Sequence, residues 1–290
     1  MKNCAILFFL FLFFGCNNPK EKNCISNNDI FCIYEDNKRT LWIGTNGGGL
    51  EEYDPVLNKF THHQNKKGDK NSLGNNTVRC IYQDEQGIIW VGTDMGLSRY
   101  EPKTGKFTNY EYTENCSNCL SANIVYTITS TSNGLLWIGT QDGGLNSFDT
   151  KSGKFKSYTI PSQLMYSGKQ EYLNQYRMRI ISLYPKGDGT MLVGTDGGGL
   201  GIFDINAQVF KNFTTFYSSG SNEVVAENNR IWSIAKDSKN EFWIAAYGGG
   251  LIQYNSNTGK YVMHQNRKND PTSLNSNDIY NVFIDKQDNV

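Results

Sequence analysis

The sequence has no net charge of either sign, little proline and little histidine. Its 28 basic and 28 acidic side chains balance, and it has 6 prolines and 3 histidines in 290 residues. No cluster of lysine and arginine marks a surface for a phosphate backbone, which argues against a nucleic-acid partner. Beyond the first sixteen residues, no apolar run approaches the roughly 20 residues that span a bilayer. With 38% hydrophobic and 13% aromatic residues, the chain can bury the core of a globular protein.

The first residues have the composition of an export signal. Lys2 precedes a small or apolar stretch from Cys4 to Gly15, which is too short to span a bilayer and suits the core of a signal peptide. We therefore expect residues 1–15 to be a signal peptide and residues 16–23 a linker. The protein would then be exported to the periplasmic or outer-surface side of a bacterial membrane.

The end of this segment resembles a bacterial lipoprotein signal. In such signals a small residue such as Gly15 precedes a cysteine, here Cys16, which is acylated and becomes the mature N-terminus. Phe13 and Phe14 stand where that signal usually has a smaller aliphatic and a small residue. Lipidation of Cys16 and an ordinary signal peptide both stay open.

One segment occurs five times along the chain. The copies are Leu41–Leu50, Ile89–Leu97, Leu136–Leu145, Met191–Leu200 and Phe242–Leu251. Their second residues, which are tryptophan in all but the fourth copy, are spaced by 48, 47, 55 and 51 positions. A period of this length indicates a repeat architecture.

Each copy lies among four predicted strands. In the first, an alternating run at 30–34 leads through a polar turn at Asp36 to the Trp-Ile-Gly-Thr strand, and then to a third strand ending at Asp54 and a fourth starting at Phe60. No copy has a helical period, which argues against leucine-rich and ankyrin arrays, and parallel β-helices have shorter coils. We predict an all-β fold over residues 24–290, a β-propeller of four-stranded antiparallel blades.

The glycine-rich turns of the repeat could suggest a phosphate-binding loop. No Gly-Lys-Ser/Thr follows them, and the next element is a strand, so no helix N-terminus faces the supposed phosphate. We interpret them as turns that require positive φ.

The Leu-Trp-Ile-Gly-Thr, Gly-Gly-Leu and Tyr-Asp-Pro motifs closely resemble the two-component regulator propeller repeat, over about residues 24–290. The resemblance implies the periplasmic sensor region of a hybrid two-component histidine kinase of the Bacteroidetes type. It also implies a ligand-sensing role, with oligosaccharides or other polymer breakdown products as ligands, and a homodimer in the full-length parent. The remaining parts of that sensor would be the partner, and this chain itself would not be an enzyme.

The last residues repeat the start of a blade. Residues 277–290 match residues 76–88 and stop shortly before the next tryptophan is due. We expect five complete blades and the first strand of a sixth, in a ring that would have seven blades in the parent protein. An open last blade would leave strand edges unpaired. The chain is therefore expected to be an N-terminal fragment of a longer product, or a truncated gene model.

Ligands of propellers bind at the mouth of the central tunnel, on the turns between second and third strands and at the entries to the innermost strands. The first kind of position is filled by Asn46, Asp94, Gln141, Asp196 and Tyr247, and the second by Arg79, Arg179 and Arg230. Forked donors and acceptors with an aromatic face suit the hydroxyls and rings of sugars. Asn and Asp also start turns by bonding their own backbone, so a structural role is the alternative for each.

Other conspicuous residues are interpreted as structural. The tryptophans, Trp232 included, are expected to pack between sheets, and small residues such as Cys32 and Cys80 to allow close approach of strands. Cys116 and Cys119 are expected to form a local disulfide or to be idle thiols. The three histidines, His62, His63 and His264, are expected on the solvated outer rim.

Two rival functions stay open. One is a surface lipoprotein that serves as a binding module without a kinase. The other, more remote, is a propeller enzyme similar to the lyases that open streptogramin antibiotics, which would need a histidine and an acid at the tunnel mouth. We expect no catalytic residues, no cofactor and no metal site in this chain. A small carbohydrate-like ligand, and the membrane through a lipid anchor or the parent's transmembrane helix, are the other expected partners.

Overall fold

Four strands form in each of the five predicted blades. The computed structural model describes residues 23–131, 134–161, 164, 179–217 and 229–290. The first two blades contain β1 (Ile30–Glu35), β2 (Leu41–Thr45), β3 (Leu50–Asp54), β4 (Lys59–His63), β5 (Val78–Gln83), β6 (Ile89–Thr93), β7 (Gly96–Glu101) and β8 (Lys106–Tyr110). The other three contain β9 (Val125–Ser130), β10 (Leu135–Thr140), β11 (Leu145–Asp149), β12 (Lys154–Tyr158), β13 (Ile180–Pro185), β14 (Thr190–Thr195), β15 (Leu200–Asp204), β16 (Val209–Thr214), β17 (Ile231–Lys236), β18 (Phe242–Ala246), β19 (Gly250–Tyr254) and β20 (Tyr261–His264).

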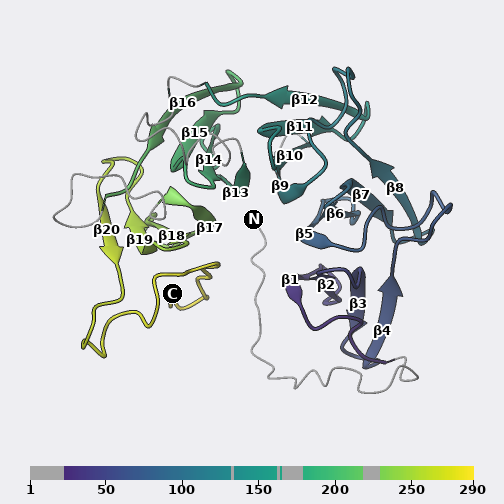
Figure 1. The fold of residues 1–290 in the computed structure, drawn as a ribbon, viewed down its shortest axis with the longest axis horizontal. Helices are drawn as coiled ribbons and strands as arrows, with labels where there is room; N and C mark the ends of the chain where they lie inside the picture. Colours follow the sequence, from purple (N-terminus) through teal and green to yellow (C-terminus); the bar gives the residue numbers. More distant parts are fainter. Residues whose placement is uncertain (1–22, 132–133, 162–163, 165–178, 218–228) are drawn as a thin grey trace. The chain divides into compact units, whose positions relative to one another are not determined.

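Each blade is a sheet of four consecutive strands paired in chain order, as Figure 1 shows. The pairing is antiparallel, with Trp42 of β2 opposite Tyr34 of β1 and Glu52 of β3. The predicted fold class, an all-β propeller of four-stranded antiparallel blades, is confirmed. No helix long and apolar enough to cross a membrane occurs in the described ranges. The expected signal peptide, the linker up to residue 22 and Cys16 lie outside those ranges.

The chain divides into two compact units. Unit 1 comprises residues 1–130 and 154–156, and unit 2 comprises residues 131–153 and 157–290. Unit 1 holds the first two blades and β9, and unit 2 holds the fourth and fifth blades with most of the third.

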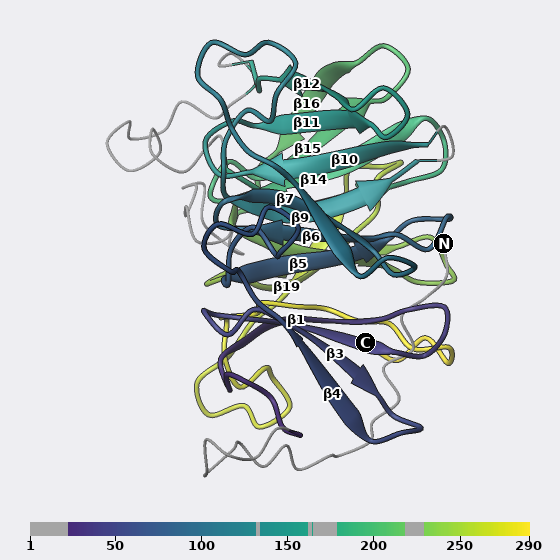
Figure 2. The same ribbon diagram turned by 90° about the vertical axis from the view of Figure 1, so that its right-hand side faces the viewer.

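In unit 1 the first blade packs on the second, as Figures 1 and 2 show for β1 and β5. One buried cluster fills the space between the two sheets. It consists of Trp42, Leu50, Leu73, Val78, Ile89, Val91, Tyr100 and Phe107. The ring centroids of Trp42 and Tyr100 are 5.5 Å apart in an edge-to-face arrangement, a favourable geometry for aromatic pairs.

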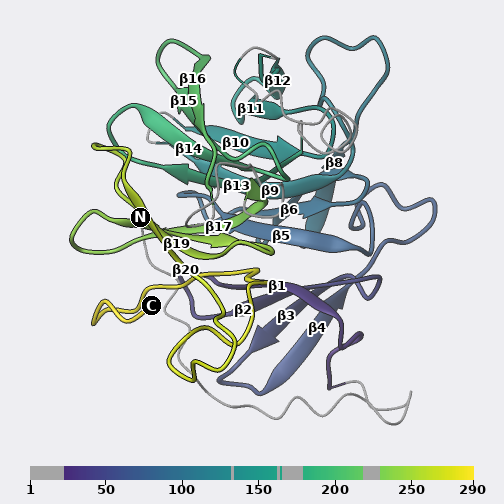
Figure 3. The same ribbon diagram turned by 60° about the vertical axis from the view of Figure 1, so that its left-hand side comes forward.

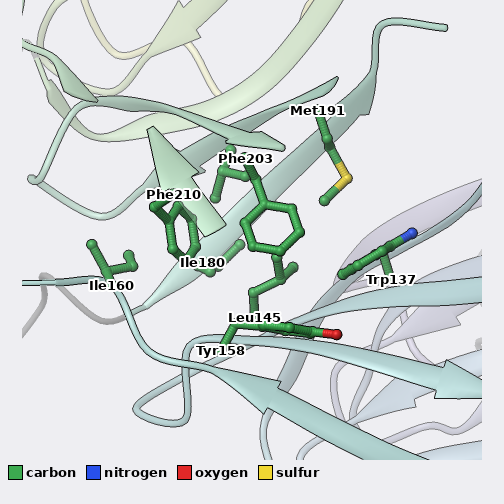
Figure 4. Packing of buried hydrophobic residues seen from close by; sticks show 9 residues of the cluster. Trp137, Leu145, Tyr158, Ile160, Ile180, Met191, Phe203 and Phe210 are labelled. Atoms are coloured by element: carbon green, nitrogen blue, oxygen red, sulfur yellow. The ribbon is translucent and has the colours of Figure 1, made fainter. Parts of the chain in front are cut away.

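Unit 2 repeats this arrangement between its own blades. Figure 4 shows Trp137 and Tyr158 of the third blade directed toward Phe203, Phe210 and Met191 of the fourth. The centroids of Trp137 and Phe203 are 5.2 Å apart. A second cluster joins the fourth blade to the fifth, whose strands are seen in Figure 3. Burial of aromatic surface between successive sheets therefore stabilises each unit.

The tryptophan of the repeat is held by the polar turn before it. In the first two blades and the fifth, its Nε1 donates a hydrogen bond to the aspartate six residues earlier, as Trp90 does to Asp84 Oδ2 at 2.7 Å. The other oxygen of that aspartate accepts backbone N–H groups of the turn. In the fourth blade leucine replaces the tryptophan at 192, and Lys186 stands at the aspartate position. The core role predicted for the repeat tryptophans is thus confirmed, although Trp243 is only partly buried.

The last glycine of each turn lies where two strands meet. Gly49 has φ of 98°, and a Cβ there would lie 2.5 Å from the carbonyl oxygen of His63 at the end of β4. Gly96 has φ of 107° and meets the carbonyl of Tyr110 in the same way. Both the conformation and the close approach require glycine, as predicted.

Cys32 and Cys80 face the glycines of the adjacent second strands. Cys32 pairs with Gly44, and a Cβ on Gly44 would touch both the Cys32 sulfur and Val78 of the next blade. Burial raises the pKa of the Cys32 thiol to about 12 and raises that of Cys80 well above its usual range. Both thiols are therefore unreactive spacers between blades, as expected.

His63 differs from the prediction for the histidines. All three histidines lie on fourth strands, but the His63 side chain is only 12% exposed. Its ring stacks on Trp42 with centroids 5.8 Å apart, and its Nε2 is 2.9 Å from Glu52 Oε2. His63 is therefore a packing residue between blades, and its expected solvation is wrong because the neighbouring blade covers this end of β4. Cys116 and Cys119 form the expected local disulfide.

The end of the chain forms a turn but not the expected first strand of a sixth blade. Residues 279–284 have no ladder partner among the described residues, so no strand is defined there. The segment lies beside β17 through a bridge of Asp278 with Tyr247 and a 2.7 Å hydrogen bond between Ser233 and Asn281. The following turn resembles those of other blades, since Asp285 Oδ1 accepts the N–H groups of residues 287 and 289.

Candidate functional site

The two kinds of predicted site position are brought together by the backbone. In three blades the residue after the second strand forms a single bridge with a residue at the start of the segment that follows the blade. Asn46 pairs with Thr77 in unit 1, and in unit 2 Asp196 pairs with Arg230 and Tyr247 with Asp278. These short bridges tie successive blades together at the ends of their strands, so polar side chains from neighbouring blades gather there.

The centre of the site in unit 2 is Asp196. Its side chain is 2% exposed, and its two oxygens accept from different arginines. Arg179 Nη1 lies 2.9 Å from Oδ2, and Arg230 Nε lies 2.7 Å from Oδ1. Arg179 precedes β13 of the same blade, whereas Arg230 precedes β17 of the next blade. Both oxygens of the buried carboxylate are therefore engaged, and two positive groups face one negative group.

Arg230 also stacks on an aromatic side chain. Its guanidinium carbon lies 4.6 Å from the ring centroid of Tyr247, a cation–π distance. We call Arg179, Asp196, Arg230 and Tyr247 the Asp196 cluster. All four were predicted as site residues, and the structure brings them together.

A second aromatic group adjoins this cluster. The ring centroids of Tyr247 and Tyr280 are 5.1 Å apart, and those of Trp232 and Tyr280 are 5.2 Å apart. We call Trp232, Tyr247 and Tyr280 the aromatic patch. A hydrogen bond with Tyr247 is the largest of the effects that raise the pKa of Tyr280. Tyr280 is 56% exposed, so the patch is open to solvent.

Trp232 was expected to pack in the core with the other tryptophans, and this expectation is wrong. Trp232 is only partly buried and lies on β17 against Tyr280, not between sheets. Its Nε1 is buried without a hydrogen-bond partner among the described residues. The repeat tryptophans differ because each of them stands on a second strand.

In unit 1 the arginine is enclosed. Arg79 Nε and Nη2 both donate to Asp94, with Nη2 3.2 Å from Oδ2. The Arg79 guanidinium lies 5.4 Å from the ring centroid of Phe31 on β1 and 4.9 Å from that of Tyr126 on β9. Rings from both neighbouring first strands therefore contact this guanidinium.

The remaining predicted residues make turn contacts. The Asn46 amide donates to Asp29 Oδ2 at 2.8 Å, and its backbone carbonyl accepts from the side chain of Asn27. The Gln141 amide donates to its neighbour Asp142 at 3.1 Å. The structural alternative that the sequence left open therefore describes Asn46 and Gln141, while Asp94 and Asp196 hold arginines.

Sequence reasoning missed Phe31, Tyr126 and Tyr280. They share one position with Arg79 and Trp232, the second residue of a first strand or of the matching C-terminal segment. The alternation within these runs could have identified them, because the buried residues Val78, Val125 and Ile231 directly precede this position and fix the register.

The cluster offers hydrogen-bond donors and aromatic ring faces. Guanidinium groups supply only hydrogen-bond donors, and the aromatic patch supplies ring faces. The histidines lie on β4 and β20, and among the described residues the ion-pair partners of Asp196 and Asp94 are arginines. Among the described residues, no group of three or more His, Cys, Asp or Glu could hold a metal ion.

Comparisons with known proteins agree with the repeat. A family model, the two component regulator propeller, matches residues 24–47, 72–95 and 119–142. These segments cover the first two strands of the first three blades. The resemblance deduced from the motifs is thus confirmed in these three segments, which match the two component regulator propeller repeat. The comparison with curated proteins gave no match.

Solved structures share the fold. The extracellular domain assigned to a hybrid two component system of B. thetaiotaomicron is 24% identical with a TM-score of 0.67, and the match covers 91% of this chain and 38% of that one. PorZ, a surface component of the type-IX secretion system of Porphyromonas gingivalis, is 17% identical with a TM-score of 0.61, covering 90% and 36%. A virginiamycin B lyase from Staphylococcus aureus is 14% identical with a TM-score of 0.59, covering 81% and 69%. This chain thus spans well under half the length of the first two.

Proposed function

We propose that this chain, which carries two component regulator propeller repeats, is the ligand-sensing propeller of a hybrid two-component histidine kinase. It would act on the outer side of a bacterial membrane and bind oligosaccharides or other products of polymer breakdown. The kinase and the membrane helix would belong to other parts of the sensor. The repeats and the shared fold support this proposal, because the same fold occurs in the extracellular domain of such a system.

The observation that carries the ligand-binding role is the Asp196 cluster with its aromatic patch. A buried carboxylate that holds two arginines is costly unless every charge is paired, so a solely structural position would be filled more simply by apolar residues. The arrangement keeps guanidinium groups from two blades in fixed positions next to exposed ring faces. Such preorganised donors beside aromatic rings suit a sugar, whose hydroxyls accept hydrogen bonds and whose C–H face packs on a ring.

Signalling would follow from differential binding. Arg230 and Asp196 belong to successive blades, so a ligand that contacts Arg230 and Tyr280 acts on the junction between them. If one arrangement of the blades binds the ligand better, binding shifts the population toward that arrangement. A dimer of the full sensor would carry this difference across the membrane.

The test is a binding measurement joined to a cellular response. Isothermal titration of the purified protein with a panel of neutral and acidic oligosaccharides should identify a ligand, and Arg230→Gln should weaken its binding. In the source bacterium the same substitution should reduce the transcriptional response to that ligand. Binding without any response in cells would contradict the sensor role, and the absence of saccharide binding would contradict the ligand class.

A second candidate is a surface binding module anchored through Cys16, which the shared fold with a bacterial surface component favours. Labelling of cells with a palmitate analogue should then mark the protein, and Cys16→Ala should abolish the label. Cys80→Ala is the matched control, because it removes a free cysteine that lies outside the lipoprotein signal. Persistence of the label in Cys16→Ala would refute lipidation at this residue.

A further inference from the structure

The hydrogen-bonding groups of the Asp196 cluster are unequally available. Both oxygens of Asp196 are used by arginines, and its side chain is 2% exposed, so it cannot accept from a ligand. The Arg230 side chain is 33% exposed, and its two terminal nitrogens have no hydrogen-bond partner among the described residues. The exposed hydrogen-bonding groups of the site are therefore the positively charged N–H donors of Arg230, whereas the Asp196 carboxylate is buried.

The guanidinium of Arg230 is also held in place. Its Nε is fixed by Asp196 on one blade, and its face is fixed on Tyr247 of its own blade. Only its outer edge is left to contact a ligand. A planar edge with two N–H groups matches a carboxylate or sulfate, which can accept two parallel hydrogen bonds.

The aromatic patch lies next to this edge. Tyr280 packs on Tyr247, and the guanidinium of Arg230 stacks on the same Tyr247 ring. Tyr280 is the most exposed ring of the patch. A sugar ring on Tyr280 would place a substituent within reach of Arg230. The unpartnered Nε1 of Trp232 adds a buried donor on the other side of Tyr280.

We infer that the Arg230 edge and the aromatic patch form a subsite for an acidic sugar, one that carries a carboxylate or a sulfate group. The inference rests on the proposed saccharide-binding function and narrows its ligand class. The acid group binds Arg230, and the ring packs on Tyr280. Asp278, which bridges to Tyr247, opposes the ligand as a like charge, but it is exposed and screened by solvent.

The probes are matched pairs of oligosaccharides. Oligogalacturonate is compared with the same backbone after methyl esterification, and a chondroitin oligosaccharide is compared in sulfated and desulfated forms. We expect the acidic member of at least one pair to bind at least about tenfold more tightly than its neutral or less charged partner. The first pair isolates the carboxylate and the second the sulfate. Added salt should weaken this binding.

Three substitutions test the residues. Arg230→Gln should weaken acidic ligands about tenfold or more and leave neutral ones within about twofold. Tyr280→Ala should weaken both classes about equally, and Tyr280→Phe should restore binding, because the ring face is kept. Asp278→Asn should tighten acidic ligands, since a like charge is removed.

The control is Arg267→Gln, which removes the same charge from an exposed side chain on the loop after β20. It should leave all affinities unchanged, and circular dichroism of every variant separates lost binding from lost folding. Tight binding of neutral sugars with no preference for acidic ones would overturn this inference but keep the proposed function. Binding of no saccharide of the panel would overturn both.

Discussion

Asp196→Asn should destabilise the protein far more than Asp94→Asn, although the two aspartates occupy the same position of the repeat. Asp196 is nearly inaccessible and accepts from Arg179 and Arg230 on two blades. Asparagine has the same shape, but it is neutral, and one of its two terminal atoms is a donor. The substitution therefore leaves a single acceptor atom for two guanidinium groups and removes the negative charge that both of them contact.

The magnitude follows from the contacts. Loss of one charge-assisted hydrogen bond costs about 1.5–3 kcal/mol. Removal of the Asp196 charge also leaves repulsion between the two arginines, which solvent partly screens because both arginines are partly exposed. We expect the free energy of unfolding to fall by about 2–4 kcal/mol. Asp94 is 31% exposed and pairs with a single arginine, so its loss should cost about 1 kcal/mol or less.

Thermal unfolding followed by circular dichroism at neutral pH measures the difference. An unfolding entropy of about 2.1 cal/mol/K per residue converts these energies to a fall in Tm of about 3–7 °C for Asp196→Asn and at most about 2 °C for Asp94→Asn. High salt should narrow the difference only slightly, since Asp196 is shielded from solvent. Equal shifts for the two variants, or a higher Tm for Asp196→Asn, would refute the assignment of Asp196 as the group that holds both arginines.

Three further outcomes follow from the repeat. Asp84→Ala should lower the free energy of unfolding by about 2–3 kcal/mol in urea titrations, because it leaves the Trp90 Nε1 and turn amides unpaired; a change below about 0.5 kcal/mol would contradict this role. Gly96→Ala should destabilise the protein strongly, because its Cβ would meet the carbonyl of Tyr110. Gly105→Ala, which also has a positive φ but lies in open space, should lower the free energy of unfolding by only about 1 kcal/mol. Equal effects of the two variants in urea titrations would refute the close-contact argument. The folded pKa of the Cys32 thiol, about 12, exceeds its unfolded value, so its contribution to stability should be complete up to about pH 9 and be lost as the pH rises toward 12. Iodoacetamide should label Cys32 only after unfolding. Rapid labelling of the native protein would contradict its burial.

The fold could be predicted because residues at fixed positions of the repeat define where each strand and turn begins. In the first two blades and the fifth, the tryptophan, the aspartate six residues earlier and the last glycine of the turn occur together, and each has one structural task. In the third blade Thr131 takes the place of the aspartate and accepts from Trp137, and in the fourth blade Leu192 and Lys186 stand at the two positions. The first strand of a sixth blade could not be predicted in the same way, because a strand depends on its ladder partner as well as on its own pattern.

The site could be predicted only in part. Positions after the second strands were identified from the motif, but the repeat says nothing about which of them meet. Arg79, Arg179 and Arg230 were placed in one class, yet Arg79 is a residue of β5 whereas the other two precede their strands. Arg79 and Arg179 pair with the aspartate of their own blade, whereas Arg230 pairs with Asp196 of the preceding blade, and the repeat pattern does not distinguish the two cases. For His63 and Trp232, exposure was set by the neighbouring blade or segment, which a pattern within one repeat does not describe.

Asp94 and Asp196 occupy the same position of the repeat, but their surroundings differ between the two units. In unit 1 the guanidinium of Arg79 contacts rings of the first strands on either side of β5, and Asp94 accepts from its Nε and one terminal nitrogen, so this arginine joins first strands. In unit 2 the carboxylate is buried instead, and the terminal nitrogens of Arg230 stay available beside Tyr280. Similar blades can therefore differ in binding capacity when the aspartate of one blade is buried and the paired arginine keeps exposed N–H groups. Substitution of each aspartate tests this difference. Asp94→Asn should leave the ligand affinity unchanged, whereas Asp196→Asn should reduce both the ligand affinity and the stability of the fold.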